Sequence, residues 1–593
     1  MPPQPESASH HSARKTDMNV YDYILVGGGT SAAVLAARLS QAADKTVLIL
    51  EAGADYVEAT LPAQLRLTGT LTALSPGSPY NWGFFGRTDS AVVPVVRGRV
   101  VGGGSTVNGA GYTRPLREEL EQWEAIGKDD WSVDRLSEIL IAVENDFDFP
   151  GGEHGDAGPI PVARVKPSAL TALSRAVIAG CLEAGFGEDE DMNAFATGEG
   201  VGRIPMNSVD GVRKGTLLTY LEPVRHRPNL IVWGGSFVRR ILFDGKRAIG
   251  VEVERDSEIS EVHGREIILC AGAIKTPHIL MLSGIGPAAQ LRANGIPIVR
   301  DLPGVGQNFQ DHPGADVTYL PRPFAIGPDT PMAEVMLHYT ASGSPLASDM
   351  EMIFMTMPFA KAMSAGRTGG RALGEWLRHL SGLVSAGLRL GIGSTIRMRR
   401  SMASLIISCR IMAEYSKGSS TLVSADPHVL PNYNFRSFSD PRDVARLVDC
   451  VRNAVRILDS RAMKPFVKRR LTPTDAVLVD NEALAHWIRT GSPPYAHTTG
   501  SCRMGPASDP DSVVDSQCRV HGVEHLRIVD LSICPVNSRR GPAAAAVMLA
   551  ERAACLIAGW TAVSKGKLAS PSTVIRETNA VPANAKVRSA NPR

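Results

Sequence analysis

The hydrophobic positions near the start of the chain form two short continuous runs that enclose a stretch with a different spacing. The first run, Ile24 to Val26, leads into three consecutive glycines, and the second, Val47 to Leu50, ends at Glu51. Between the runs, alanine and leucine residues from Ala32 onward are spaced as in a helix. This order of strand, tight turn, helix and second strand predicts a βαβ unit, and so an α/β fold.

The glycine turn has the features of a dinucleotide site. Gly27 permits the sharp turn, Gly29 lets the backbone approach phosphates, and Ala32 is small enough for close helix–strand packing. The helix N-terminus, with Thr30 and Ser31, presents free N–H groups and a positive dipole end to a pyrophosphate. Glu51, 22 residues after Gly29, is placed to accept hydrogen bonds from both ribose hydroxyls. A βαβ unit without a phosphate ligand is the alternative, and the position of Glu51 favours the dinucleotide site.

A second glycine-rich segment, residues 94–112, has too many glycines for a regular helix or strand. Gly102 to Ser105 would bring the backbone close to a flat or charged ligand, and Asn108 offers both a donor and an acceptor. Taken alone, the 94–112 segment would be interpreted as a flexible loop. Together with the first glycine motif, it indicates a second contact with the cofactor.

Two further patterns extend the predicted sheet. Alternating apolar residues between 229 and 253 predict short strands around a hairpin turn at Asp244-Gly245. The run Glu266 to Leu269 passes through a small-residue turn into a helix containing His278, which predicts another parallel βα unit. Residues 113–200 contain no chemistry that we can identify from sequence.

Residues 316–480 differ in composition from the rest. Short strands at 405–410 and 420–423 beside proline-rich turns predict an antiparallel sheet. Apolar residues from Leu373 to Leu388 recur at helical spacing, and seven arginines lie between Arg367 and Arg400. The spacing favours a lid helix packed on its own domain over a membrane-binding or partner-binding surface.

The last informative region contains His497, within residues 495–505, and a final alanine-rich helix within 541–554. Pro542 is suited to the first helical position. The positive end of this helix can stabilise negative charge that develops on a nearby ligand.

Composition limits the class of protein. The chain has 593 residues, 44% of them hydrophobic and 21% charged, with a net charge of +3. These values describe a globular protein of two to four domains, without a basic stripe for nucleic acid. Eight cysteines without short paired spacings indicate reduced, buried thiols rather than disulfides or a metal site. The polar N-terminus and the lack of long apolar runs lead us to expect a cytoplasmic enzyme with no transmembrane segment.

Together these segments resemble the glucose–methanol–choline (GMC) family of FAD-dependent oxidoreductases. The resemblance spans residues 20–560 and includes Arg97 to Asn108, Gly272 to Pro287, the segment around His497 and the last helix. It implies a Rossmann-like FAD-binding domain in two parts, 20–315 and 481–562. It also implies an α+β substrate-binding domain at 316–480. The polar composition of the two ends predicts a disordered tail at 1–19 and a mobile tail at 563–593.

The resemblance also assigns residues. It places FAD in the Gly27–Glu51 site and makes His497 the active-site histidine. The other implied cofactor contacts are the flavin-edge loop with Val100, Gly102, Gly103, Ser105 and Asn108, the adenine contact Val238, the cofactor-lining Ala271, Asp530 by the ribityl–pyrophosphate region, and Ala544 in the last helix. Oxidising an alcohol requires loss of the hydroxyl proton while hydride leaves the α-carbon for flavin N5, and a neutral imidazole can take that proton. The rate should therefore rise with pH through the histidine's pKa.

Two positions depart from the family pattern. Many members have a second active-site His or Asn where we align Ala543, so the usual histidine–polar pair is missing unless Asn537 or Ser538 substitutes. Without such a substitution the chemistry would rest on His497 alone, or on something unusual. Some relatives carry a flavin-linking histidine where this chain has Val95, which implies non-covalent FAD.

The leading hypothesis is an FAD-dependent alcohol dehydrogenase that passes electrons to an acceptor other than oxygen, such as a protein or a quinone. An oxidase that produces hydrogen peroxide, a lyase or light-driven decarboxylase, and a non-catalytic flavoprotein are the alternatives. The apolar content of residues 316–480 points to a hydrophobic alcohol as substrate.

Overall fold

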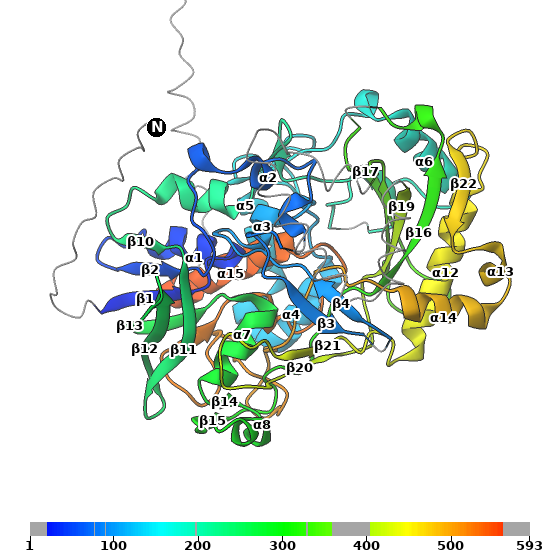
Figure 1. Cartoon of the computed structure of the whole chain (residues 1–593). Coiled ribbons are helices and arrows are strands. Elements are labelled where there is room, and N and C mark those ends of the chain that lie inside the picture. Colours follow the sequence, from blue (N-terminus) through cyan, green and yellow to red (C-terminus); the bar gives the residue numbers. More distant parts are fainter. Residues whose placement is uncertain are drawn as a thin grey trace, which may run out of the picture.

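The computed structural model of the chain describes residues 20–358, apart from positions 76, 89, 196, 197, 328 and 329, and residues 404–560. It contains a mainly parallel sheet in one half of the molecule and an antiparallel sheet in the other (Figure 1). The predicted tails at 1–19 and 563–593 and the predicted helix at 373–388 lie outside the described residues.

The first sheet contains the predicted βαβ unit. Its strand order is β10-β2-β1-β13-β12-β11, and β23 pairs with β13. The parallel strands are β10 (Leu230–Trp233), β2 (Val47–Leu50), β1 (Tyr21–Val26), the end of β13 (Glu258–Leu269) and β23 (Leu526–Ile528). Because their apolar runs lie in the interior, Ile24 to Val26 and Val47 to Leu50 are at most 1% exposed.

The long strand β13 joins the parallel sheet to a hairpin. Its first half pairs antiparallel with β12 (Arg247–Arg255), which pairs antiparallel with β11 (Ser236–Asp244). Gly245 adopts a φ of +59° in the turn between β11 and β12, as the predicted hairpin requires. β13 then leads into α7 (Gly272–Leu282), so both predicted patterns are confirmed.

Two helices that are far apart in sequence pack together beside this sheet. They are α1 (Thr30–Leu39) and α15 (Ala543–Ala558), and a buried ion pair between Arg38 and Glu551, with an N···O distance of 2.7 Å, joins them. Pro542 caps α15 instead of starting it, so the helix begins one residue later than predicted.

The second sheet lies on the opposite side of the molecule (Figure 1). Its order is β22-β16-β19-β18-β17-β7, and all its pairs are antiparallel. The strands are β22 (Val467–Thr472), β16 (Gly314–Pro321), β19 (Leu405–Ile411), β18 (Met350–Met355), β17 (Ala333–Tyr339) and β7 (Gly200–Arg203). The helices α6 (Ala172–Glu183), α12 (Pro441–Leu458) and α14 (Asn481–Gly491) pack with one face in a common hydrophobic core.

The strand pattern predicted at 405–410 is confirmed as β19, whereas the one at 420–423 falls in a different sheet. That sheet has the order β20-β21-β3-β4, with β20 (Ser419–Thr421), β21 (Asn432–Asn434), β3 (Phe84–Arg87) and β4 (Val92–Val95). The smaller elements are α2 (Ala63–Arg66), α3 (Gly104–Val107), α4 (Arg117–Gly127), α5 (Val133–Val143), β5 (Glu144–Asp146), β6 (Ile160–Val162), β8 (Ser208–Val209), β9 (Val212–Arg213), β14 (Ile285–Gly286), α8 (Ala288–Ala293), β15 (Arg300–Asp301) and α13 (Asp475–Leu478).

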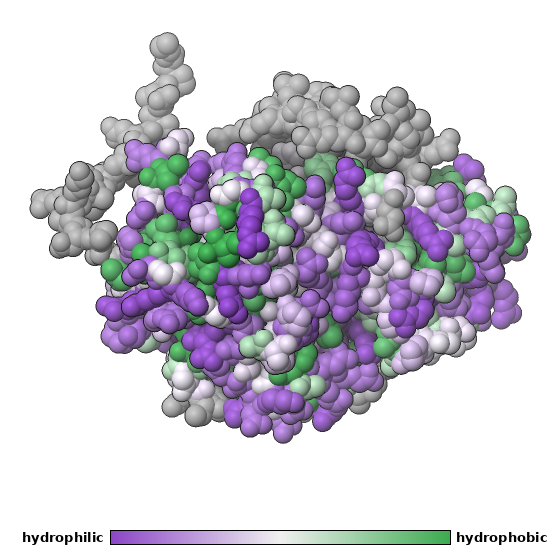
Figure 2. All heavy atoms as spheres, turned by 90° about the horizontal axis from the view of Figure 1, so that it is seen from below, coloured by the Kyte–Doolittle hydropathy of each residue, from purple (hydrophilic) through white to green (hydrophobic). Residues whose placement is uncertain are grey.

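Hydrophilic residues predominate on the face seen in Figure 2, with smaller groups of hydrophobic ones between them. Within the described residues, every helix is too short or too polar to cross a membrane. All eight cysteines are buried and free, which confirms the prediction of reduced thiols.

Candidate active site

A cavity of about 950 Å³ extends from the glycine turn after β1 to the second sheet. One end is formed by main chain around α1, α3 and α7, and the other by side chains of β17 and β18 together with His497. We describe these as the dinucleotide end and the substrate end.

The dinucleotide end is formed largely by backbone. Gly29 caps α1 without any side-chain hydrogen bond, so the first N–H groups of the helix stay available. A Cβ built on Gly29 would lie 3.5 Å from the carbonyl oxygen of Cys270 and otherwise in open space. A Cβ on Gly103 would lie 2.8 Å from Gly29 Cα. The two glycine segments therefore approach each other closely and leave room for a ligand in front of α1.

Two carboxylates are held in place at this end. Glu51 accepts hydrogen bonds from the main-chain N–H groups of Gly28, at 2.8 Å, and Gly53, at 2.7 Å. Asp530 accepts hydrogen bonds from the Gly272 N–H, at 2.9 Å, and from Thr276, at 2.6 Å. Burial raises the pKa of both groups, and these hydrogen bonds oppose the increase. Both side chains line the cavity in a fixed orientation.

At the substrate end, the main chain around His497 is clamped from two sides. The carboxylate of Asp311 accepts hydrogen bonds from the N–H groups of Ala496, at 3.1 Å, and His497, at 2.8 Å. The guanidinium of Arg97 donates to the carbonyl of Ala496, at 2.7 Å, and to the hydroxyl of Thr498. Ala496 itself has a φ of +71°, a strained value for a residue with a Cβ. These contacts fix the residues on both sides of the histidine.

His497 has a histidine as its partner. The Nδ1 atoms of His497 and His312 are 3.0 Å apart, so one ring donates and the other accepts. Burial, together with the nearby charges of His312 and Arg97, lowers the pKa of His497 well below its ordinary value. Burial likewise lowers the pKa of His312 to about 4. If Nδ1 of His497 carries the hydrogen and donates it to His312, then Nε2 of His497 is free to accept a proton.

A hydrogen-bonded chain of three side chains adjoins His497. The ring centroid of Tyr495 lies 4.3 Å from that of His497. The Tyr495 hydroxyl donates to Glu351, at 2.8 Å, and the other oxygen of Glu351 pairs with Nε2 of His338, at 3.0 Å. Glu351 and His338 belong to neighbouring strands, β18 and β17, so the second sheet orients Tyr495.

This chain matches known proteins along most of its length. GMC oxidoreductase family models match residues 21–314 and 414–550. An uncharacterized GMC-type oxidoreductase of Rhodococcus erythropolis is 36% identical over 547 residues, 92% of this chain and 99% of that protein. The chain belongs to the GMC oxidoreductase family. Oxygen-dependent choline dehydrogenase 1 of Chromohalobacter salexigens is 31% identical over 560 residues, 92% of this chain and 96% of that protein.

A solved structure shares the fold. The pyridoxine 4-oxidase from Mesorbium loti is 27% identical and superposes with a TM-score of 0.75, over 90% of this chain and 98% of that one. The predicted resemblance, the fold class and the cofactor FAD are thus confirmed. The residues present fit this cofactor, since the free N-terminus of α1 faces open space beside the anchored carboxylate of Glu51.

Most of the predicted contact residues line the cavity, and four do not. Those in its wall are Gly27, Gly29, Thr30, Ser31, Glu51, Gly103, Ser105, Asn108, Val238, Ala271, His497 and Asp530. Ala32, Val100, Gly102 and Ala544 are buried behind it. In α15 the helical period turns Ala543 and Ala546 toward the cavity and Ala544 into the core. At Gly102 the N–H donates to the Gly28 carbonyl, at 2.7 Å, so this residue joins the two glycine segments.

The structure shows where the residues that depart from the family pattern lie. Gly541, Pro542 and Ala543 all line the cavity, and none has a polar side chain. Asn537 and Ser538 are absent from the cavity wall, and Asn537 donates to Glu414, at 3.1 Å. Neither side chain of this pair therefore takes the place in the cavity wall that Ala543 leaves without a polar group. Val95 packs in a separate hydrophobic cluster with Phe84 and Phe309.

Sequence reasoning missed several residues of the substrate end. Asp311 and His312 lie in the loop before β16, and Glu351 and His338 lie in strands of the second sheet. The adjacent Asp311-His312 pair is a sequence signal that could have indicated a functional site. The sequence around Glu351 and His338 contains no such signal, because only strand pairing places these residues next to Tyr495.

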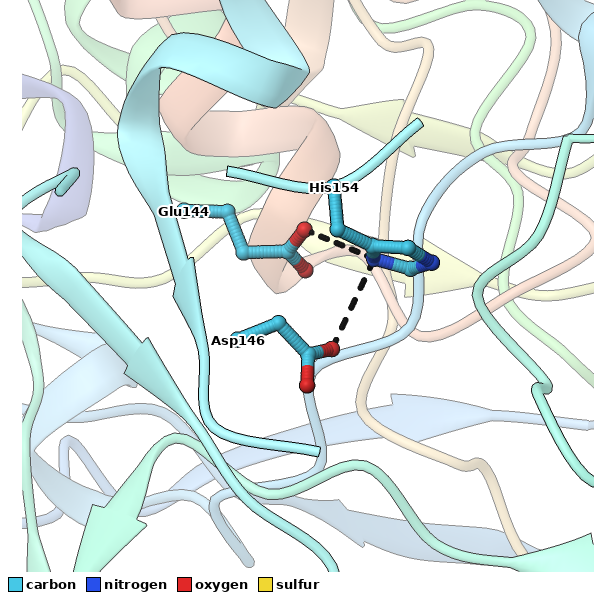
Figure 3. A group of neighbouring side chains, drawn as sticks. All are labelled: Glu144, Asp146 and His154. Carbon is cyan, nitrogen blue, oxygen red and sulfur yellow. Dashed lines mark hydrogen bonds and ion pairs between the residues drawn. The ribbon is translucent and has the colours of Figure 1, made fainter. Parts of the chain in front are cut away.

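A second polar cluster, also missed, lies away from the cavity. Figure 3 shows Glu144, Asp146 and His154 with their acceptor and donor atoms turned toward one another, as in a metal site. However, Arg114 pairs with Glu144, and Arg164 pairs with Asp146 at 2.8 Å. Burial opposes protonation of His154, but its hydrogen bonds to Asp191 and Glu144 raise its pKa to about 9. The cluster is a buried charge network in which Arg114, Arg164 and the protonated His154 supply the positive charge.

Proposed function

We propose that this protein oxidises an alcohol to a carbonyl compound, with His497 as the general base. The observation that supports this most directly is the neutral imidazole of His497 in the wall of the FAD cavity, with its main chain held by Asp311. A buried neutral imidazole can accept a hydroxyl proton at Nε2. FAD, when bound, supplies the acceptor for the hydride that leaves the α-carbon.

The other residues of the substrate end hold and enclose the substrate. Asp311 and Arg97 keep the His497 main chain in place, and His312 orients its ring. Met336, Ile353 and Met355 form an apolar wall that excludes water. In this arrangement His497 acts without a polar side chain from the start of α15.

The likeness to choline dehydrogenases and to pyridoxine 4-oxidase supports an alcohol as the substrate, since choline and pyridoxine are both alcohols. We propose that FAD is held without a covalent bond, because the position at which some relatives carry a flavin-linking histidine is Val95, which is buried in a hydrophobic cluster. We also propose that electrons pass to an acceptor other than oxygen, and that the enzyme is cytoplasmic.

Anaerobic mixing with a panel of alcohols tests the proposal. The flavin absorbance band should bleach with at least one alcohol, and the product should be the matching carbonyl compound. Hydrogen peroxide formation, compared with reduction of an artificial dye, then separates an oxidase from a dehydrogenase. A flavin that no alcohol bleaches would contradict the proposed function.

A further inference from the structure

The basic side chains in the wall of the cavity lie at opposite ends. In the part of the chain that the structure describes, the lysine and arginine residues of this wall are Lys275 and Arg97. Arg97 belongs to the substrate end, where it holds the carbonyl of Ala496. Lys275 lies in the first turn of α7, next to Thr276, which donates to Asp530. Lys275 is therefore the basic side chain of the dinucleotide end.

The amine of Lys275 is surrounded by groups that carry no negative charge. The residue is 5% exposed, and its Nζ lies 5.1 Å from the ring centroid of Phe237 and 5.6 Å from that of Trp82. Nζ also lies 3.0 Å from Nδ1 of His278. Burial and the charge of Lys275 lower the pKa of His278 to about 2, so this ring is neutral. Because an ammonium group only donates hydrogen bonds, His278 accepts this one, and two N–H groups of Lys275 remain.

Among the described residues, no carboxylate neutralises Lys275. Burial lowers the pKa of the lysine to about 8, the charge of Arg99 adds to this decrease, and no acidic side chain opposes it. Near neutral pH most molecules therefore carry a charged Lys275. A buried cation without a counter-charge destabilises the folded protein, and cation–π contacts recover only part of that free energy. This position favours an anion that enters the cavity from outside.

FAD carries such an anion in its pyrophosphate group. The first N–H groups of α1 are available to phosphate at this end, but the same wall contains the carboxylates of Glu51 and Asp530. Negative carboxylates repel a phosphate, and a cation in the same wall offsets that repulsion. Phe237, whose ring contacts Lys275, directly precedes Val238, the predicted adenine contact. The lysine thus lies on the side of the cavity where we expect the adenosine.

We propose that Lys275 binds the adenosine diphosphate half of FAD through its positive charge, and that this contact determines how tightly the chain retains the cofactor. His278 positions the amine by accepting one of its hydrogen bonds. The inference concerns cofactor binding and does not depend on alcohol oxidation or on His497.

The test measures the dissociation constant of FAD for the full-length protein after its FAD has been removed, followed by flavin fluorescence. Lys275→Met keeps a long side chain without the charge. The Kd should rise by about 10–100-fold, the range for a hydrogen bond to a charged group. The Kd of ADP, measured by calorimetry, should rise by a similar factor. Lys246→Met is the matched control, because it removes an exposed lysine from the turn between β11 and β12.

The pH dependence of FAD binding tests the charge without a variant. Bound pyrophosphate favours the charged lysine, so the wild-type affinity should be highest near neutral pH. It should fall by up to about tenfold between about pH 7 and pH 9, as the free lysine loses its proton. The other charged and titratable groups around Lys275 are His278, Arg99 and His428, which pairs with Glu254 behind the ring of Phe237. All of them remain in Lys275→Met, whose affinity should be constant over this range.

Thermal stability separates cofactor binding from a structural role. Without FAD, Lys275→Met should melt at the wild-type temperature or above it, because the variant removes an unpaired buried charge. The proposal would be overturned by an unchanged Kd, an equal loss of affinity in Lys246→Met, a loss for FAD but not for ADP, a wild-type affinity independent of pH, or a lower melting temperature of Lys275→Met without FAD. None of these measurements uses an alcohol, so their outcome is independent of the proposed oxidation.

Discussion

At the dinucleotide end of the cavity, the groups that face the ligand are mainly main-chain atoms and short side chains near Gly29 and Gly103. At the substrate end they are polar and apolar side chains from separate segments. The first end is positioned by local turns and one helix N-terminus. The second requires β17, β18 and the loop around His497 to meet. Ligand binding at the end formed by main chain should therefore be disturbed mainly by mutations that add a Cβ to a glycine. Function at the end formed by side chains should be disturbed by each mutation that shortens one of them.

The largest effect is expected at Gly29. In Gly29→Val the new Cβ would make only an ordinary contact with the Cys270 carbonyl, at 3.5 Å, and the side chain would enter the open space in front of α1 that the pyrophosphate needs. The protein should fold and retain no FAD, as measured by flavin absorbance after gel filtration. Gly187→Val is the control, because a Cβ there meets nothing within 4 Å and lies outside the cavity wall. Normal flavin content in folded Gly29→Val would refute the assignment of this end.

His497→Ala should have the next largest effect. Loss of the general base should slow flavin reduction by about 10²–10⁴-fold, toward the larger value because no polar side chain extends from the start of α15. FAD content should be unchanged. Stopped-flow reduction measures the rate, and the exposed His486→Ala is the control. A rate like that of the wild type would mean that His497 is structural.

The pH profile of the wild-type enzyme sharpens this prediction. The neutral imidazole is the reactive form, and burial holds its pKa well below the ordinary value. The rate should therefore be level through neutral pH and fall only in acid, as a proton occupies Nε2. This revises the expectation from sequence of a rise near the ordinary histidine pKa of about 6.5. A rise through that ordinary value would indicate a solvated His497.

A smaller effect is expected at Asp311, which acts through the main chain of His497. Asn offers one acceptor where the carboxylate receives several N–H groups, so Asp311→Asn should loosen the histidine. We expect kcat to fall by about tenfold, the effect of one lost hydrogen bond to a charged group, with unchanged FAD content and pH profile. The exposed Asp301→Asn is the control. An equal loss of FAD would show that Asp311 has a general structural role.

The smallest effect is expected for Met336→Leu, which conserves volume in the apolar wall. Such exchanges usually cost less than about 1.5 kcal/mol, so kcat/KM should change by less than about tenfold and kcat should stay nearly constant. Met352→Leu in the core is the control, and it should affect only thermal stability. A large fall in kcat for Met336→Leu would mean that this wall positions the reacting atoms.

Local sequence determined the first βαβ unit, the hairpin at Gly245, the helix after β13 and most of the dinucleotide end. These features depend on residues close together in the chain, such as Gly27 with its φ of +94° and Glu51 at the end of β2. A turn, a helix N-terminus and a short buried strand each have a local physical cause, and so each leaves a local pattern. His497 was assigned differently, through the resemblance to the GMC family, in a motif that also contains Tyr495.

Only the tertiary structure decided which side chains surround His497. Pairing of β17 with β18 places His338 opposite Glu351, and the register then brings Glu351 to Tyr495. The alternation of β18 could have been assigned to either face, because a shift of one residue exchanges the faces of a strand. Burial, and with it the neutral state of His497, likewise depends on the packing of distant segments. Patterns of nearby residues carry no information on such contacts, because these contacts form and stabilise the protein only when the two sheets enclose the cavity.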